Sequence, residues 1–321
     1  MTQRLLIAVA ALAAALVLTL GAAAGNGGPI NPNSQNALTL AVIGDVPYGA
    51  DQAAAFPGWI AAINADPKVD LAVHLGDIKN GSTRCDDSYF ATIADDLAGF
   101  KDPLVYTPGD NEWTDCHRAN NGAYNPLERL AAIRHTFFAH PGVTLGGRKK
   151  QVVAQTDYPE NVLWMQSQTV FAALHVVGSN NSLAPWSGLG NTAPAPEQLA
   201  EANARIAAAI DWIDFAFDTA EANGAAGVVL IMQADMFEGA NETLTGFASI
   251  VDRIEERAGE FAGPVLLLEG DSHVYTEDHP LADAPNVTRI VVHGETLPAE
   301  YLRLTIDPRA ASLFTWERVE I

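Results

Sequence analysis

Residues 38–48 read LTLAVIGDVPY, a largely apolar run of strand length that ends in a glycine and the carboxylate of Asp45. The same order returns in AVHLGDIKNG around Asp77, VYTPGDNEW around Asp110, and LLLEGDSHVY around Asp271 and His273. Side chains that follow separate buried strands can converge at one edge of a sheet, and carboxylates there suit metal-assisted chemistry. The acidic loops therefore predict a site at the carboxyl ends of the strands.

Around these loops, apolar runs of strand length alternate with longer segments of helical periodicity. The expected strands are Leu38–Gly44, Asp70–Gly76, Pro103–Thr107, Val162–Met165, Thr169–Val177, Gly227–Gln233, Pro264–Glu269, Thr288–His293, Tyr301–Ile306 and Ser312–Val319. The expected helices are Ala50–Asn64, Asp86–Phe100, Asn125–Phe138, Pro196–Asn223 and Gly246–Ala262. Strand-helix alternation followed by a strand-rich C-terminus predicts an α/β sandwich with mixed sheets.

The N-terminal segment has the layout of a secretory signal. Its only charge is Arg4, the run Leu5–Leu20 is almost wholly apolar, and small residues follow up to Ala24. We therefore expect residues 1–24 to be a signal peptide, and the protein to be secreted or periplasmic. An uncleaved membrane anchor is the alternative.

A leader and one domain are expected to follow the signal. Residues 25–36 are rich in Gly, Asn and Pro, which is typical of a flexible leader. The chain has 321 residues with 48% hydrophobic content, enough for one large core, and we expect a single domain at residues 37–321.

The chain is strongly acidic. Without Arg4 it has 17 basic residues against 39 acidic ones, a formal charge of −22. Such a chain repels polyanions, so a nucleic acid duplex is excluded as a partner, and no membrane association is expected after signal cleavage. The composition says nothing about the oligomeric state.

Two cysteines, Cys85 and Cys116, each lie a few residues beyond an acidic loop. If the preceding strands are neighbours, the two loops are close enough for a disulfide, which an oxidising compartment would preserve. A metal-binding pair is the alternative, but it lacks a CxxC spacing or a flanking cysteine.

The acidic loops resemble those of the calcineurin-like metallophosphoesterase superfamily. Its ligand loops have the order DxH, GDxx, GNH with an acid, a lone His, and GHxH. In this chain the corresponding segments are Gly44-Asp45-Val46-Pro47, Gly76-Asp77-Ile78, Gly109-Asp110-Asn111-Glu112, Gln233 in VVLIMQAD, and Gly270-Asp271-Ser272-His273. The resemblance extends from Leu38 onward and implies a four-layer α/β/β/α sandwich with two mixed β-sheets.

The resemblance also implies the ligands of two metal sites. The first comprises Asp45, Asp77 and His273, with Pro47 where the family has a histidine. The second comprises Asp77, Asp110, Gln233 and Asp271. Carboxylate and amide oxygens in place of imidazoles favour one or two hard divalent cations such as Ca²⁺, Mg²⁺ or Mn²⁺ over zinc or iron.

The third loop differs from the family at the histidine that assists the leaving group. Without a gap in the alignment, Asn111 takes that catalytic position, and an amide donates a hydrogen bond but transfers no proton near neutral pH. A one-residue gap would instead make Asn111 the ligand and Glu112 the acid-base group. His117 is a candidate for the missing proton donor, with a surface role for it and Arg118 as the alternative.

Several polar residues near these loops are candidate substrate contacts. Arg118 can bind a phosphate oxygen, since guanidinium pairs well with oxyanions. Lys79 and Asn80 directly follow Asp77, and Asn180 lies in a Gly-Ser-Asn-Asn cluster after a strand, although such clusters are first of all turns.

The function that the resemblance implies is hydrolysis of small phosphate mono- or diesters by a metal-activated water, performed by an exported enzyme. The alternative is a catalytically degenerate member of the fold that acts as a cation- or protein-binding module. The chain has no GxSxG elbow, HExxH helix or Walker-type glycine loop, so serine hydrolases, zincins and nucleotide kinases lack their defining motifs.

Overall fold

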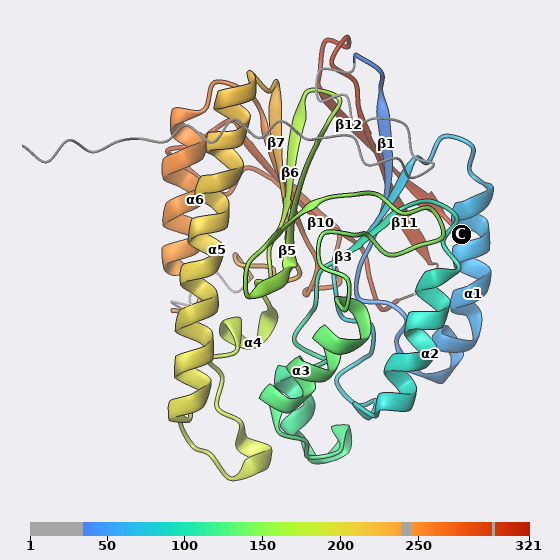
Figure 1. Cartoon of the computed structure of the whole chain (residues 1–321), viewed down its shortest axis with the longest axis vertical. Helices are drawn as coiled ribbons and strands as arrows, with labels where there is room; N and C mark the ends of the chain where they lie inside the picture. The colour runs from blue at the N-terminus through green and yellow to red at the C-terminus, as the bar shows by residue number, and fades with distance from the viewer. Residues whose placement is uncertain (1–34, 239–244, 297–298) are drawn as a thin grey trace, which may run out of the picture.

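The computed structural model describes residues 35–238, 245–296 and 299–321. Two mixed β-sheets pack face to face, and helices cover the outer face of each (Figure 1). The predicted four-layer α/β/β/α sandwich is therefore confirmed. The predicted signal peptide at 1–24 and nearly all of the leader at 25–36 lie outside the described residues, and the single-domain assignment for 37–321 stays a prediction.

The first sheet has the strand order β12-β11-β1-β2-β3. Its strands are β1 (Leu38–Ile43), β2 (Leu71–His74), β3 (Leu104–Tyr106), β11 (Glu300–Ile306) and β12 (Phe314–Glu320). Strands β1, β2 and β3 run parallel, while β11 is antiparallel to β1 and β12. The loops that follow β1, β2 and β3 therefore leave the sheet at the same edge.

The second sheet has the order β4-β5-β6-β7-β8-β10-β9. Its strands are β4 (Val153–Gln155), β5 (Tyr158–Gln166), β6 (Thr169–Ala173), β7 (Gly227–Ile231), β8 (Val265–Glu269), β9 (Thr276–Asp278) and β10 (Val287–Val291). Strands β6, β7, β8 and β10 are parallel neighbours. Their carboxyl ends thus provide a second set of loops along one edge.

Three hydrophobic layers hold the sandwich together. Leu40 and Val73 of the first sheet meet Phe171 and Leu266 of the second in the layer between the sheets. Helices α1 (Gly49–Ala65), α2 (Asp87–Ala98) and α3 (Pro126–Phe137) cover the first sheet, and α5 (Pro196–Asn223) and α6 (Ala248–Glu260) cover the second (Figure 1). A short helical segment, α4 (Gly178–Asn181), follows β6, and 3-10 turns span Thr114–His117, Ala119–Asn121 and Ser187–Leu189. In the described ranges no helix is both long and apolar enough to cross a membrane.

Every strand and helix that the sequence predicts is present, with ends that shift by a few residues. The short strands β4 and β9, at the two edges of the second sheet, were not predicted. Each has only three residues, too few to show an alternating pattern in the sequence.

Candidate metal centre

The loops after β1, β2, β3 and β8 bring four carboxylates together at the shared edge of the sheets. Asp45 has φ 55°, Asp77 has φ 56° and Asp271 has φ 72°, all in the left-handed region that non-glycine residues rarely adopt. Such conformations cost on the order of 1 kcal/mol or more each and concentrate at functional sites. Here they turn the chain sharply after each strand.

The carboxylates form two overlapping groups with one member in common. Ligand atoms of Asp45, Asp77 and His273 lie within 4.8 Å of one another, and so do those of Asp77, Asp110 and Asp271. Asp77 belongs to both groups, as expected of a residue that bridges two ions. The structure thus brings together all the predicted metal ligands of carboxylate and imidazole type.

These four carboxylates have no lysine or arginine partner within the described ranges. Among the described residues, no ion pair joins Asp45, Asp77, Asp110 or Asp271 to a lysine or arginine; Asp45 is paired only with the His273 imidazole, at 3.8 Å. Burial, followed by repulsion from neighbouring carboxylates, raises the pKa of Asp45, Asp77 and Asp271 well above the ordinary value. A divalent cation is the chemical species that would relieve this repulsion.

Glycines allow the carboxylates to approach one another. A Cβ atom at Gly178 would lie 2.6 Å from Asp271 Oδ1 and 2.8 Å from Asp110 Oδ2. A Cβ atom at Gly270 would lie 2.7 Å from Asp45 Oδ2. A side chain at either position would therefore displace these carboxylate oxygens. The donor set of carboxylates with one imidazole fits a hard divalent cation.

Gln233 contacts the cluster through its amide. Its Oε1 accepts a hydrogen bond from the backbone N of Gly178 at 2.7 Å, and its Nε2 donates to Asp271 Oδ1 at 3.0 Å. The amide NH₂ group thus orients Asp271, and the direct ligation expected of Gln233 stays a prediction.

Tyr48 is a residue of the cluster that the sequence prediction missed. Its hydroxyl donates to Asp77 Oδ2 at 2.7 Å and lies 3.3 Å from His273 Nε2, and its ring meets the His273 ring edge-on at 5.3 Å. Pro47 stands where the family has a histidine, and Tyr48, the next residue, reaches the group instead. A polar-tipped aromatic three residues after Asp45 was the signal available in the sequence.

Asn111 and Glu112 occupy different sides of the Asp77 loop. The Asn111 Nδ2 donates to Asp77 Oδ2 at 2.6 Å, and its backbone N donates to Asp77 Oδ1 at 3.1 Å. Glu112 Oε1 accepts from the backbone N of Asp77 at 3.1 Å and of Gly109 at 2.6 Å. Glu112 thus ties two loops together, while Asp110 joins the carboxylate group, as the alignment without a gap expects.

The predicted disulfide is present, and it joins the second and third acidic loops. Cys85 and Cys116 are bonded, with their Cα atoms 5.9 Å apart. Beside them, Lys79 is fully buried, and its Nζ donates to the carbonyl oxygens of Asn111 at 2.7 Å and Asn80 at 2.9 Å. Burial lowers the pKa of Lys79 to about 8. The prediction that Lys79 contacts the substrate is wrong, because its buried ammonium group donates its hydrogen bonds to two carbonyl oxygens of the protein.

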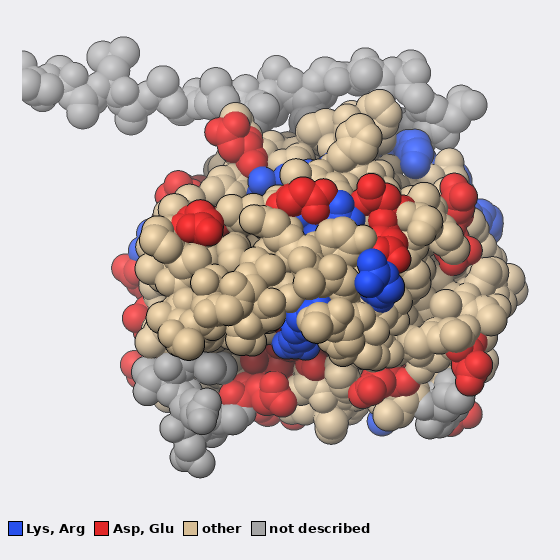
Figure 2. Space-filling view, turned by 90° about the horizontal axis from the view of Figure 1, so that it is seen from below, with Lys and Arg blue, Asp and Glu red and all other residues tan. Residues whose placement is uncertain are grey.

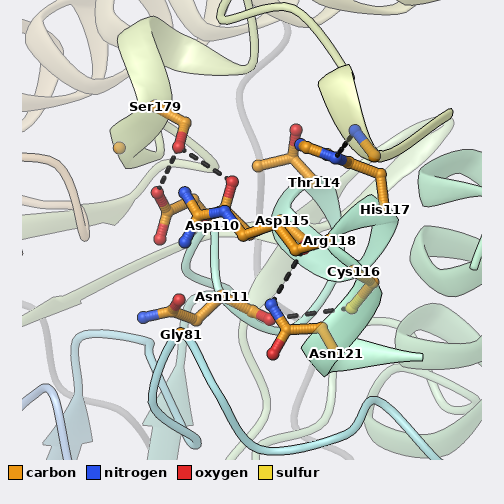
Figure 3. Close-up of polar contacts among 12 residues, drawn as sticks. Gly81, Asp110, Asn111, Thr114, Asp115, Cys116, His117, Arg118, Asn121 and Ser179 are labelled. Carbon is orange, nitrogen blue, oxygen red and sulfur yellow. Dashed lines mark hydrogen bonds and ion pairs between the residues drawn. The ribbon is translucent and has the colours of Figure 1, made fainter. Parts of the chain in front are cut away.

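His117 and Arg118 point in different directions (Figure 3). His117 is buried, and its Nδ1 accepts a hydrogen bond from the backbone N of Gly188 at 3.1 Å. Burial, together with the Arg118 charge, lowers the pKa of His117. The Arg118 guanidinium is 43% exposed and contacts Asp115 Oδ2 through Nη2 at 2.5 Å. Arg118 therefore lies at the site's surface, whereas His117 is turned toward the 3-10 turn that contains Gly188.

Asn80 and Asn180 are half-buried and take part in turns. Asn80 Oδ1 accepts hydrogen bonds from Ser82 and Thr83. Asn180 Oδ1 accepts from the backbone N of Gly246 at 2.9 Å. Their amide oxygens thus hold loops, and the substrate contacts expected of them stay predictions.

The face that Figure 2 shows, seen from below, has acidic and basic side chains interspersed around a largely uncharged centre. The view includes no continuous basic surface of the kind that duplex nucleic acids require. The lack of a basic surface in this view agrees with the negative net charge of the chain.

Comparison with known proteins identifies a matching protein family. A model described as calcineurin-like phosphoesterase matches residues 38–197, which include the loops of Asp45, Asp77 and Asp110. No curated protein matches the chain in sequence.

Two solved structures are similar in fold. One is a purple acid phosphatase from yellow lupin (Lupinus luteus) seeds, with a TM-score of 0.53 and 11% identity over 90% of this chain and 52% of that one. The chain thus spans about half the length of the lupin protein, and the likeness concerns the fold alone. The other is GAP50, the anchor in the inner membrane complex of Plasmodium, with a TM-score of 0.47 and 9% identity over 89% of each chain.

Proposed function

Because the chain belongs to the calcineurin-like phosphoesterase superfamily, we propose that it is an exported, metal-dependent enzyme that hydrolyses small phosphate mono- or diesters. One observation carries the proposal. The carboxylates of Asp45, Asp77 and Asp110, all buried, and of Asp271, half-buried, converge without a lysine or arginine partner among the described residues. A protein that used these loops only for internal support would have neutralised them with its own basic side chains.

The proposed ligands are Asp45, Asp77 and His273 for one cation, and Asp77, Asp110 and Asp271 for a second. Four carboxylates balance the charge of two divalent ions, and the oxygen-rich set favours Ca²⁺, Mg²⁺ or Mn²⁺. When bound, such a cation supplies a Lewis acid that activates water and offsets charge on the phosphoryl oxygens.

The chain's own residues have distinct proposed roles around the cations. Asn111 and Tyr48 orient Asp77 through hydrogen bonds to its Oδ2. Arg118 binds a phosphate oxygen at the exposed side of the site. Asn80 and Asn180 are proposed further substrate contacts, through their amide NH₂ groups.

His117 is the proposed proton donor to the leaving oxygen; this role requires the protonated ring, in which both nitrogens carry a proton and Nδ1 releases its hydrogen bond from the backbone N of Gly188. His117→Gln distinguishes this role from structural support. As a proton donor, the residue matters most for alkyl esters and least for aryl esters, whose leaving groups need no proton. A support role would lower the rates of both classes equally.

Export is proposed from the signal-like pattern at residues 1–24, and the disulfide suits an oxidising compartment. Neither a nucleic acid duplex nor, after signal cleavage, a membrane is a proposed partner.

The test is phosphatase and phosphodiesterase activity of the disulfide-intact protein after chelation, with Ca²⁺, Mg²⁺, Mn²⁺ and Zn²⁺ restored separately. Asp77→Ala is expected to lower turnover by about 10³-fold or more, because it removes the ligand that both groups share. Asp95→Ala, which removes an exposed carboxylate on α2, is the matched control and should leave turnover unchanged. If no cation restores turnover and none raises the melting temperature, the proposal fails. Cation binding without turnover would support the binding-module alternative instead.

A further inference from the structure

Beyond the metal ligands, and resting on the proposed function, we propose that Asp115 is a positioning residue that holds Arg118 ready to bind a phosphate oxygen. Ser179 ties this pair to the candidate metal ligand Asp110. The chain of contacts thus links phosphate recognition to the carboxylate cluster.

The contacts run continuously from Asp110 to Arg118 (Figure 3). Ser179 Oγ lies 2.8 Å from Asp110 Oδ2 and 3.0 Å from Asp115 Oδ1. The second oxygen of Asp115, Oδ2, lies 2.5 Å from Arg118 Nη2. Both Asp115 oxygens are therefore used, one toward the cluster and the other toward the guanidinium.

Gly81 and Asn111 define the position of the Arg118 guanidinium beside the carboxylate cluster. A Cβ atom at Gly81 would lie 3.1 Å from Arg118 Nη1 and 3.3 Å from Asn111 Oδ1. The guanidinium therefore lies over the Asp77 loop and next to Asn111, whose Nδ2 reaches Asp77. A glycine at position 81 leaves room for this arrangement.

Exposure separates the two partners. The Asp115 side chain is only 5% exposed, while the Arg118 side chain is 43% exposed. The buried Asp115 carboxylate contacts Nη2 of the guanidinium, and the exposed part of the Arg118 side chain is accessible to an anion. Guanidinium binds oxyanions through paired N–H groups, so its orientation governs its affinity for phosphate.

The backbone around this pair is also fixed. Asp115 lies in the 3-10 turn Thr114–His117, and its neighbour Cys116 is held by the disulfide to Cys85. The backbone N of Asp115 donates to Asp110 O at 3.0 Å, and that of Arg118 donates to Asp115 O at 3.1 Å. A preorganised cation of this kind loses little entropy when an anion binds.

The test is a double-mutant cycle on the cation-loaded, disulfide-intact full chain, with inorganic phosphate as the probe. Asp115→Asn keeps the size of the side chain and removes its charge, and we expect phosphate affinity to fall about tenfold. Arg118→Ala should lower it at least as much, and in that background Asp115→Asn should have no further effect. Cation affinity, measured by calorimetry, should change less than about twofold in each variant.

Kinetics provide the second readout. Asp115→Asn should raise KM while kcat stays nearly constant, and Asp115→Glu should recover part of the loss. A similar decrease by Asp115→Asn with and without Arg118, or an unchanged phosphate affinity, would overturn the inference. The proposed function would survive either result if cation-dependent turnover persists. If the wild-type protein binds cation but no phosphate, the anion-binding role of Arg118 fails, and this inference with it.

Discussion

Among the described residues, no lysine or arginine pairs with the buried Asp45 and Asp77 or the half-buried Asp271, whereas the buried Glu160 lies between Arg134 and His175. Arg134 Nη2 is 2.6 Å from Glu160 Oε1, its Nε is 3.1 Å from Oε2, and His175 Nδ1 is 2.8 Å from Oε1. Although burial opposes ionisation, the hydrogen bonds and charge of these partners lower the pKa of Glu160 to about 2.

The two regions thus differ in how the charge of their carboxylates is balanced. Burial lowers the pKa of His175, and the Arg134 guanidinium supplies a permanent positive charge beside Glu160. In the part of the chain that the structure describes, no arginine or lysine pairs with the carboxylates of the candidate metal centre. The difference indicates that the chain itself supplies the positive charge beside Glu160, while a bound cation would supply it at the candidate metal centre.

The largest expected effect comes from removing the internal cation. Arg134→Met leaves the buried Glu160 carboxylate with only the His175 imidazole beside it, and we expect the free energy of unfolding to fall by about 3 kcal/mol. Urea denaturation measures this change. Arg309→Met, which removes an exposed partner of Asp307, is the control and should cost less than about 1 kcal/mol. Equal effects of the two substitutions would remove the distinction between the regions.

The pH dependence of ion-free stability should show both regions with opposite signs. The raised pKa values of Asp45, Asp77 and Asp271 mean that their contribution is full below the ordinary value of 3.8 and is lost as pH rises through the folded-state values. Glu160 contributes fully above its ordinary value of 4.5, and that contribution is lost as pH falls toward about 2.

Each proton contributes at most about 1.4 kcal/mol per pH unit to these slopes. Urea midpoints from pH 2 to 8 with a chelator present would measure them. Glu160→Gln should flatten only the acidic slope, and added Mn²⁺ only the slope at higher pH. A single slope that neither treatment changes would contradict the comparison.

A smaller effect is expected from neutralising one carboxylate of the metal centre. Asp271→Asn keeps the side chain's shape and its contact with Gln233 while it removes one repelling charge, so the ion-free protein should gain about 1 kcal/mol at pH 8. The increase in melting temperature on cation addition should shrink at the same time. Thermal unfolding with chelator and with Mn²⁺ measures both. A loss of stability in the ion-free variant would show that the charge is compensated internally after all.

The smallest effect concerns Tyr48. Tyr48→Phe keeps the ring against His273 and removes the hydroxyl from Asp77, and we expect cation affinity to fall about fivefold, roughly the value of one hydrogen bond. Calorimetric titration measures it. Tyr124→Phe removes a hydroxyl that donates to Asp86 and should leave the affinity unchanged. An unchanged affinity in Tyr48→Phe would mean that Asp77 needs no such support.

The sequence predicted the layers and the metal-binding loops because both depend on local patterns. Apolar periodicity located every major strand and helix, and an acidic residue after a strand end located Asp45, Asp77, Asp110 and Asp271. The disulfide was predicted from the position of Cys85 and Cys116 just beyond two acidic loops, and it is present because the preceding strands β2 and β3 are neighbours.

What the sequence did not predict depends on side-chain direction across elements. Ser179 reaches Asp115 across a separation of 64 residues, and no local pattern encodes that contact. Lys79 was predicted to contact substrate, but its ammonium group turns inward and donates to two carbonyl oxygens. Gln233 Oε1 accepts from a backbone N–H of the loop after β6, a contact between residues 55 positions apart that no local pattern encodes.

The candidate ligands come from both sheets, since Asp45, Asp77 and Asp110 follow strands of one and Asp271 and His273 follow a strand of the other. Asp271 already joins the two through its backbone N, which donates to Asp45 Oδ1 at 3.0 Å. An ion held by these side chains acts as a mechanical clamp, because sliding of one sheet over the other would pull its ligands apart. Cation loading should therefore slow amide hydrogen exchange in β1 and β8 together. The rigidity of the sandwich would then depend on the cation concentration of the surrounding solution.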